Sequence, residues 1–406
     1  MKRGAALALG LALLAIPATS VSAAPKKVGR PTYHAKTYAV QSPYVVVHYT
    51  RTGPDHPRFM KDDDHDGIPN YVEKLAAAAN KAWLYYGHNG FKAPLPDAGG
   101  PNRKVDIYVK ALPPGIQGVT IPASKTKKGA FMVVDNQLDM AHLAMHGSLQ
   151  QTVAHELFHL FQLSYVPDGT IPPWVAEGSA TAMQTFVYPQ IADAAAFSGI
   201  DMWLNQPWRS LYDQKQGCSH CYGGALWWRF VFSMGNHTLP SYLGRLYGYK
   251  TIAKATLSGL QPLDEILQRK DHQTLFTAFS RFSYDIYRAG YKPATYTRLS
   301  ATAAVQTTPA RTVKGLSTHY IPVSVPADAK GVGITIAAAG GPNPEVKLVV
   351  GGPKGRVVEG VLQNGGAEQF FSTSFASPAE RDHVTLIVTS GRADGVAYRI
   401  NYQAQA

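Results

Sequence analysis

The sequence predicts an α+β protein in which a mixed domain precedes an all-β domain. Segments with helical periodicity and segments with strand character are interleaved over 41–298, and from about Leu299 short β-branched runs alternate with Gly/Pro turns. This spacing favours a separate antiparallel β-sandwich over 299–406. The strands that we expect there cover residues 320–325, 332–337, 346–350, 384–389 and 398–402.

Length and composition indicate a globular chain. It has 406 residues, of which 45% are hydrophobic and 16% charged, which is comfortable for two domains that each bury a core. The formal net charge is +12, but Lys and Arg are scattered and aromatic residues do not alternate with them. We therefore expect a solvated basic surface and no nucleic-acid partner.

The N-terminus has the order of a secretory signal peptide over 1–23. Two basic residues precede an apolar run over 4–16, and a small-residue stretch ends at Ala23. Such an arrangement is typical of a cleaved export signal, and the apolar run is too short to span a bilayer. We expect cleavage after Ala23, a linker or short pro-segment over 24–40, no transmembrane segment, and a secreted or periplasmic protein.

Alternating strands and amphipathic helices are expected in the first domain. β-branched and aromatic runs predict strands over 44–49, 105–109 and 130–134, and an Asp-rich loop leads into a helix through Leu75. Ser148 with Gln151 is a capping box that opens the next helix. Further helices are expected over 174–186, 223–233, 239–246 and 275–287.

The segment His155-Glu156-Leu157-Phe158-His159 carries a metal-binding pattern. Its two imidazoles stand at i and i+4, on one face of a helix, where both can bind one ion. Glu156, one position along, can reach a metal-bound water. A catalytic zinc needs three protein ligands and an open position, and Glu177 on the following helix is placed to be the third. The plain alternative for Glu177 is a first-turn glutamate favoured by the helix dipole.

This pattern resembles the gluzincin metallopeptidases, in which two His and a downstream Glu hold zinc. The likeness rests on the His155–His159 motif and on Trp174-Val175-Ala176-Glu177-Gly178. Gln162 and Tyr165 stand where a metzincin has Gly and His, which excludes that pattern. The resemblance implies a zincin-like domain over 41–298. Thr181 occupies a place where gluzincins often carry an acidic residue behind a zinc-bound His, so the sequence names no such partner.

Five segments within residues 44–235 carry a second resemblance: the His48-Tyr49-Thr50 strand, the Asp-rich loop over 62–73, the helix over 154–159, Glu177-Gly178 and Tyr222-Gly223. On these segments the chain resembles a family of bacterial secreted metallopeptidases that have an Asp-rich calcium loop. Members of that family are assigned as peptidases chiefly by motif, so the likeness supports the class of enzyme more than the substrate. In such a centre Glu156 is the expected general base. Tyr222 is the expected stabiliser of the oxyanion, with His220 and Tyr212 behind it, and the alternative for Tyr222 is a packed core tyrosine.

Residues 62–73 fit the twelve-residue calcium loop. Carboxylates fall at positions 1, 3 and 5, a glycine at position 6, and further oxygen ligands at positions 7, 9 and 12. The expected calcium ligands are Asp62, Asp64, Asp66, the Ile68 carbonyl, Asn70 and Glu73. We expect one structural Ca²⁺, and the alternative is a solvated acidic loop.

Cys218 and Cys221 are the two cysteines of the chain. In an exported protein the favoured interpretation is a short-loop disulfide. A structural zinc would need two more ligands, and a redox-active pair has no thioredoxin-like context here.

The sequence therefore predicts a secreted zinc peptidase that acts on protein or peptide substrates. A different class of protein is the alternative: a catalytically inactive zincin-fold protein that binds partners, or adheres to the cell envelope, through its β-sandwich. The intact set His155, Glu156, His159 and Glu177 favours the enzyme.

Overall fold

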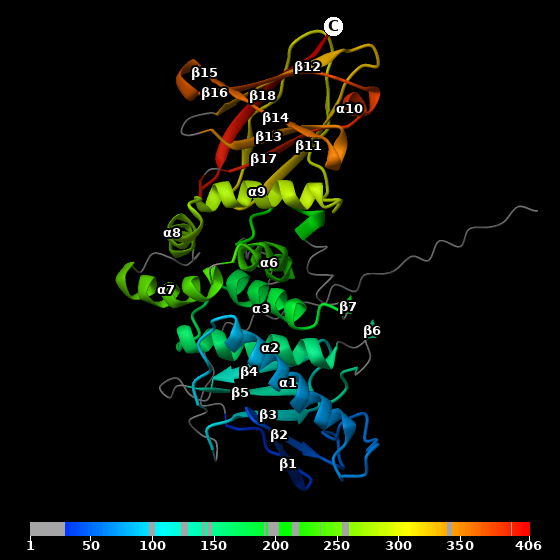
Figure 1. Cartoon of the computed structure of the whole chain (residues 1–406), viewed down its shortest axis with the longest axis vertical. Helices are drawn as coiled ribbons and strands as arrows, with labels where there is room; N and C mark the ends of the chain where they lie inside the picture. The colour runs from blue at the N-terminus through cyan, green and yellow to red at the C-terminus, as the bar shows by residue number, and fades with distance from the viewer. Residues whose placement is uncertain are drawn as a thin grey trace, which may run out of the picture.

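The structure is a computed structural model of the whole chain (Figure 1). The residues that it describes are 29–96, 102–122, 129–139, 143–144, 148–190, 192–193, 203–212, 219–235, 237–253, 260–338, 343–390 and 392–406. The expected signal peptide over 1–23 and Cys218 lie outside the described residues.

A five-stranded mixed sheet lies at the N-terminal end of the molecule, in the order β1-β2-β3-β5-β4 (Figure 1). β2, β3 and β5 run parallel, whereas both edge strands are antiparallel to their neighbours. The segment expected as a linker over 24–40 supplies most of the first edge strand. The strands are β1 (Thr37–Gln41), β2 (Val45–Thr50), β3 (Val105–Lys110), β4 (Gly118–Pro122) and β5 (Ala130–Asp135).

Two helices cover one face of this sheet, α1 (Asn70–His88) and α2 (Leu149–Tyr165). Alternate residues of each strand face them, so that Val45, Val47 and Ile107 join the same buried core as the apolar stripes of both helices. The Ser148 hydroxyl caps α2 by accepting the Gln151 amide, 3.4 Å away. The second half of the predicted capping box does not form, because the Gln151 side chain donates to Tyr188 O instead.

The opposite face of the sheet is crossed by the segment that precedes β1. Arg30 Nη1 contacts the buried Asp106 Oδ2 at 2.5 Å, and His48 Nε2 lies 2.8 Å from the other carboxylate oxygen. The Tyr33 hydroxyl donates to main-chain carbonyls of β2 and β3. Burial opposes ionisation of Asp106, but the hydrogen bonds from His48 and Arg30, together with the Arg30 charge, outweigh it and hold the pKa of the carboxyl below its usual range. The segment that we expected to be a linker is thus held against the sheet by the contacts of Arg30 and Tyr33.

A helical layer follows α2 along the chain. Trp174 of α3 stacks on Trp228 of α6, and both are fully buried in the core that the sheet shares. A short parallel pair, β6 (Leu143–Ala144) with β7 (Ala192–Asp193), also occurs. The helices are α3 (Pro173–Val187), α5 (Ser219–Gly223), α6 (Ala225–Ser233), α7 (Thr238–Ala253), α8 (Leu260–Asp271) and α9 (Leu275–Arg288).

Two mainly antiparallel sheets form the C-terminal part. One has the order β14-β13-β17-β11-β8, and the other the order β10-β18-β12-β16-β15 with β9 on β18. Apolar side chains from both sheets form one buried cluster that begins at Leu299. The elements are β8 (Leu299–Ser300), β9 (Gln306–Thr307), β10 (Arg311–Val313), β11 (Thr318–Ser324), β12 (Gly331–Ala338), β13 (Glu345–Val350), η1 (Gly352–Lys354), β14 (Arg356–Val358), β15 (Val361–Gln363), η2 (Asn364–Gly366), β16 (Glu368–Ser374), α10 (Pro378–Asp382), β17 (Val384–Thr389) and β18 (Val396–Gln405).

Helix α9 lies between the two parts (Figure 1). One side of it places Phe279 and Phe282 in the N-terminal core. Its other side packs Tyr284 and Tyr287 against a cluster on β11, β13 and β17. The Tyr320 hydroxyl donates to Ser283 O at 2.8 Å. α9 therefore packs against both parts of the chain.

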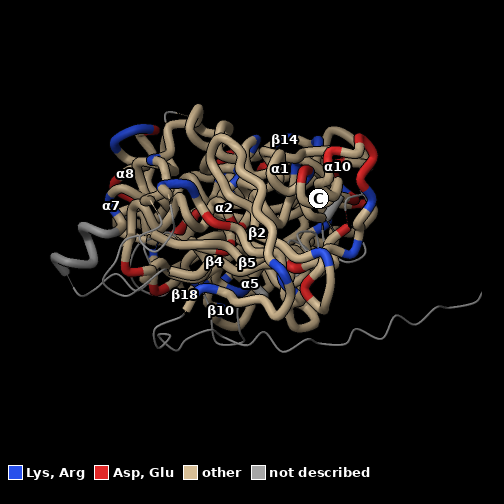
Figure 2. Tube along the Cα trace, turned by 90° about the horizontal axis from the view of Figure 1, so that it is seen from below, with Lys and Arg blue, Asp and Glu red and all other residues tan. Residues whose placement is uncertain are grey.

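The expectation of a mixed α and β chain is confirmed. Among the described residues, no helix has both the length and the apolar character that crossing a membrane requires. Figure 2 shows Lys and Arg distributed around the trace and interspersed with Asp and Glu, rather than gathered on one element.

Candidate metal centre

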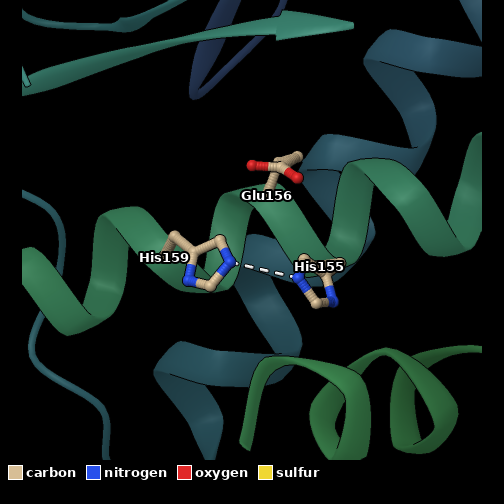
Figure 3. A group of neighbouring side chains, drawn as sticks. All are labelled: His155, Glu156 and His159. Carbon is tan, nitrogen blue, oxygen red and sulfur yellow. Dashed lines mark hydrogen bonds between the residues drawn. The ribbon is translucent and has the colours of Figure 1, made fainter. Parts of the chain in front are cut away.

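The two histidines of α2 lie side by side on the helix (Figure 3). Their Nε2 atoms are 3.1 Å apart. The Glu156 carboxylate projects from the adjoining position, and one donor atom from each of His155, Glu156 and His159 lies within 4.8 Å of the others. The i, i+4 spacing therefore brings the two imidazoles together as predicted.

The third predicted ligand comes from α3. After the proline-rich turn, Pro173 starts this helix, and Glu177 faces α2. Its Oε2 lies 3.2 Å from His155 Nε2 and 3.6 Å from His159 Nε2. The structure thus brings together the three side chains that the sequence proposed as a zinc set.

The spacing of these three donor atoms suits a zinc ion. Tetrahedral zinc with bonds of about 2.0–2.1 Å separates its ligand atoms by roughly 3.3 Å. The sides of the triangle formed by His155 Nε2, His159 Nε2 and Glu177 Oε2 measure 3.1, 3.2 and 3.6 Å. The three side chains keep 12%, 16% and 25% of their surface exposed, so each of them is partly accessible to solvent.

Two glutamines support the imidazoles from behind. Gln184 Oε1 lies 2.8 Å from His155 Nδ1, and Gln162 Oε1 lies 2.8 Å from His159 Nδ1. Gln162 Nε2 donates to Ala176 O and to Ser179 Oγ, both at 2.9 Å. Because its nitrogen is engaged, its oxygen must face the imidazole, so the neutral form of His159 would carry its proton on Nδ1 and present a bare Nε2 to a metal.

These glutamines are the supporting residues that sequence reasoning missed. The sequence pattern led us to expect an acidic residue one turn after Glu177. Thr181 stands there, and its buried hydroxyl has no hydrogen-bond partner among the described residues. The partner of His155 instead comes two turns after Glu177, on the same face of α3. The signal was a Gln at i+7 from Glu177, and a Gln at i+3 from His159.

The charges of the donor atoms depend on one another. Burial opposes a proton on His159, but the Glu177 carboxylate, with help from Glu156 and Gln162, outweighs it and raises the pKa of His159 to about 9. Burial also disfavours ionised Glu177, yet the two imidazoles outweigh it and hold the pKa of Glu177 well below its usual range. A cation bound by all three atoms would replace that proton.

Glu156 is positioned by the edge strand β4. Its side chain is 7% exposed, and Thr120 Oγ1 lies 2.9 Å from Glu156 Oε2. Gly118 precedes Thr120 by two residues, so it lies on the same face of the strand. A Cβ atom at Gly118 would lie 2.7 Å from Glu156 Cγ. The absence of a side chain there is what lets the carboxylate lie against the strand.

Tyr222 of α5 lies at the same site. Its ring stacks on His155 with a centroid distance of 6.2 Å. Burial, followed by the Glu177 and Glu156 carboxylates, raises the pKa of Tyr222. Of the two alternatives, His220 is buried. The Tyr212 hydroxyl donates to Ala393 O in the C-terminal part, so Tyr212 is committed elsewhere.

The Asp-rich loop before α1 gathers three carboxylates. One oxygen from each of Asp62, Asp64 and Asp66 lies within 4.8 Å of the others. Asp62 Oδ2 accepts the Gly67 amide at 2.9 Å, and Gly67 has φ +85°, the turn that the sixth position of a calcium loop needs. The remaining Asp62 oxygen, Oδ1, is buried and has no hydrogen-bond partner within the described part of the chain.

The three remaining expected calcium ligands, Ile68, Asn70 and Glu73, differ in their surroundings. Burial, and then the carboxylates of Asp64, Asp66 and Asp62, raise the pKa of Glu73. The Ile68 amide donates to Asp66 Oδ1 at 2.7 Å. Asn70, however, forms two hydrogen bonds with Asp63, of 3.0 and 2.6 Å. Asn70 is therefore engaged with a neighbouring residue outside the expected ligand set.

Cys221 is disulfide-bonded. It is 1% exposed and belongs to the N-terminal core. Its carbonyl lies against Gly178 of α3 and Gly224, where a Cβ at either position would approach it to 3.0 Å. The disulfide thus lies near the turn that carries Tyr222 towards the metal centre.

No family model matches the chain, and a search of curated proteins finds no match.

Proposed function

We propose that this chain is an exported zinc peptidase with a zincin-like N-terminal domain. The observation that carries the proposal is the triangle of His155 Nε2, His159 Nε2 and Glu177 Oε2, whose spacing matches that of tetrahedral zinc. Glu156 beside this triangle supplies the carboxylate that a hydrolytic reaction needs. The resemblance of the His155–His159 motif and Glu177 to metallopeptidase motifs supports a peptide bond as the bond that is cleaved.

Each residue of the site has a separate role in the proposed hydrolysis. A zinc ion held there would supply Lewis acidity to a carbonyl and to a water. Glu156 takes one proton from the attacking water and later gives it to the leaving amine nitrogen. Gln162 and Gln184 keep both imidazoles in the tautomer that binds through Nε2.

Tyr222 is proposed to stabilise the oxyanion. Its ring stacks on His155, so its hydroxyl is a hydrogen-bond donor carried on a side chain that borders the candidate metal ligands. Its raised pKa keeps the proton on the hydroxyl throughout the working pH range, which a hydrogen-bond donor requires.

An extended peptide is the substrate shape that the site favours. β4 is an edge strand, and β5 is its only partner among the described strands. Main-chain groups on the other edge of β4 can pair with an added strand, and this edge strand also contacts Glu156. A peptide that pairs with β4 would pass beside the general base.

Calcium and the C-terminal part are proposed to act outside the reaction. The orphaned buried oxygen of Asp62 and the raised pKa of Glu73 support a Ca²⁺ in the Asp-rich loop. The two C-terminal sheets, which share one core, support an antiparallel β-sandwich. We propose that this sandwich serves envelope contact, since α9 separates it from the metal centre (Figure 1).

The test compares the mature chain from residue 24 with its Glu156→Gln variant. We expect about one zinc per chain in both, cleavage of fluorescein-labelled casein by the wild type, and turnover at least a hundredfold lower in the variant. Glu345→Gln is the matched control, because Glu345 is exposed on β13 of the C-terminal part. A wild type that holds zinc but cleaves nothing would instead favour the catalytically inactive binding protein.

A further inference from the structure

The side chain of the proposed general base is fixed by a strand rather than by the helices of the metal ligands. Thr120 Oγ1 lies 2.9 Å from Glu156 Oε2 and 2.8 Å from the main-chain oxygen of Glu156. Gly118 leaves room for the Glu156 side chain on the same strand face, since a Cβ there would clash with Cγ at 2.7 Å. β4 therefore sets where the carboxylate lies.

A threonine hydroxyl has one proton to donate and can rotate. Thr120 faces two acceptors of one residue, so its proton can point to the carboxylate or to the main-chain carbonyl. When the proton points to the carboxylate, the hydroxyl stabilises ionised Glu156 by a charge-assisted bond. Because Oε2 remains an acceptor when the other carboxylate oxygen is protonated, Thr120 can donate to it in both protonation states of Glu156.

We propose that Thr120 is a positioning residue that holds Glu156 in both stages of proton transfer, an inference that rests on the proposed peptidase function. In the first stage Thr120 donates to Oε2 of the ionised carboxylate. Water then loses an O–H bond and the other carboxylate oxygen, Oε1, gains one, while Oε2 remains an acceptor for Thr120. Glu156 passes the proton from Oε1 to the leaving amine, so no proton is gained or lost at Thr120.

Four forms of the full mature chain test this role: wild type, Thr120→Ser, Thr120→Cys and Thr120→Val. Ser keeps the hydroxyl, Cys keeps a weak donor of similar size, and Val keeps the shape without the donor. We expect kcat on fluorescein-labelled casein to fall in the order Thr and Ser, then Cys, then Val. The loss for Val should be about tenfold to a hundredfold, the usual value of one hydrogen bond to a charged group. KM and zinc content should stay unchanged.

A second measurement needs no turnover. The infrared difference between the metal-free protein and its Glu156→Gln variant isolates the Glu156 carboxylate band. The same difference is recorded in the Thr120→Ser and Thr120→Val backgrounds. We expect the band to shift in the Val background and to stay in place in the Ser background.

The outcomes separate the two proposals. If kcat follows the melting temperature of the variants rather than the presence of a hydroxyl, or if Val leaves both kcat and the infrared band unchanged, Thr120 has no positioning role. If the wild type itself cleaves no substrate, the peptidase function fails, and the infrared result alone then decides whether Thr120 holds Glu156.

Discussion

Gln184 Oε1 and His155 Nδ1 lie 2.8 Å apart, on the side of the imidazole that faces away from Glu177. Gln184 follows Glu177 by two helical turns on α3, so a single helix contacts both nitrogens of His155. This arrangement makes α3 the element that orients His155 in the candidate metal centre.

Replacing Gln184 by Met should weaken zinc binding about tenfold to a hundredfold, because the imidazole loses the acceptor that fixes its tautomer. Competition against a zinc chelator measures the affinity. Gln268→Met on α8 is the control, since Gln268 is exposed and bonded only locally to Asp264. Equal zinc affinities in the two variants would contradict the supporting role of Gln184.

Zinc binding should release protons at neutral pH. The raised pKa of His159, about 9, means that the metal-free folded protein keeps this proton, and the associated stability is complete below 6.5 and is lost as the pH rises through about 9. Zinc requires the neutral imidazole, so its apparent affinity should increase by about tenfold per pH unit up to about 9 and then level off. Titration calorimetry in buffers of different ionisation enthalpy at pH 7 should report roughly one proton released per zinc. A value of zero would refute the coupling.

Calcium should raise the melting temperature through Asp62 and not through Asp63. Asp62 carries the buried oxygen without a partner, whereas Asp63 pairs with Lys61 and Asn70. At a hundredfold excess over its dissociation constant a bound ion adds about 2.7 kcal/mol of stability. Thermal unfolding with and without Ca²⁺ should therefore show a shift in the wild type and in Asp63→Asn, but none in Asp62→Asn.

Gly118→Ala should reduce kcat more than tenfold while zinc content stays the same. The added Cβ would lie 2.7 Å from Glu156 Cγ and 3.1 Å from Thr152 Cγ2, which forces the carboxylate away from the strand. The control is Gly87→Ala on α1, where a Cβ meets nothing within 4 Å. That variant should keep full activity and gain about 0.5–1 kcal/mol of stability. Loss of activity in both variants would count against the steric argument.

The helices of the site could be predicted from sequence because their signals are local. The Ser148 cap and the 3.6-residue stripe locate α2, and Pro173 locates the start of α3. The approach of Glu177 to the two histidines follows from helix geometry and a short turn. The placement of these ligands needed no knowledge of distant segments.

The edge strands could not be predicted in the same way. β4 spans Gly118–Pro122, with a glycine and a proline at its ends, and these residues argue locally against a strand. Pairing with β5 decides its conformation. β1 lay within a segment that we expected to be a linker, and its pairing with β2 likewise comes from a partner further along the chain. Tertiary pairing outweighed local preference at both edges.

The supporting glutamines were missed for a chemical reason. We expected a carboxylate at one fixed spacing behind the imidazoles, but any acceptor that reaches Nδ1 serves. Gln162 and Gln184 reach it with amide oxygens at spacings that the expected pattern does not include.

The position of α9 has a consequence for the whole chain. Phe279 and Phe282 belong to the N-terminal core, and Tyr284 and Tyr287 pack against a cluster of the C-terminal part. Each part therefore buries apolar surface against the same helix. A chain ending at residue 298 would present two tyrosines to water and should aggregate, and calorimetry of the intact chain should record one melting transition rather than two.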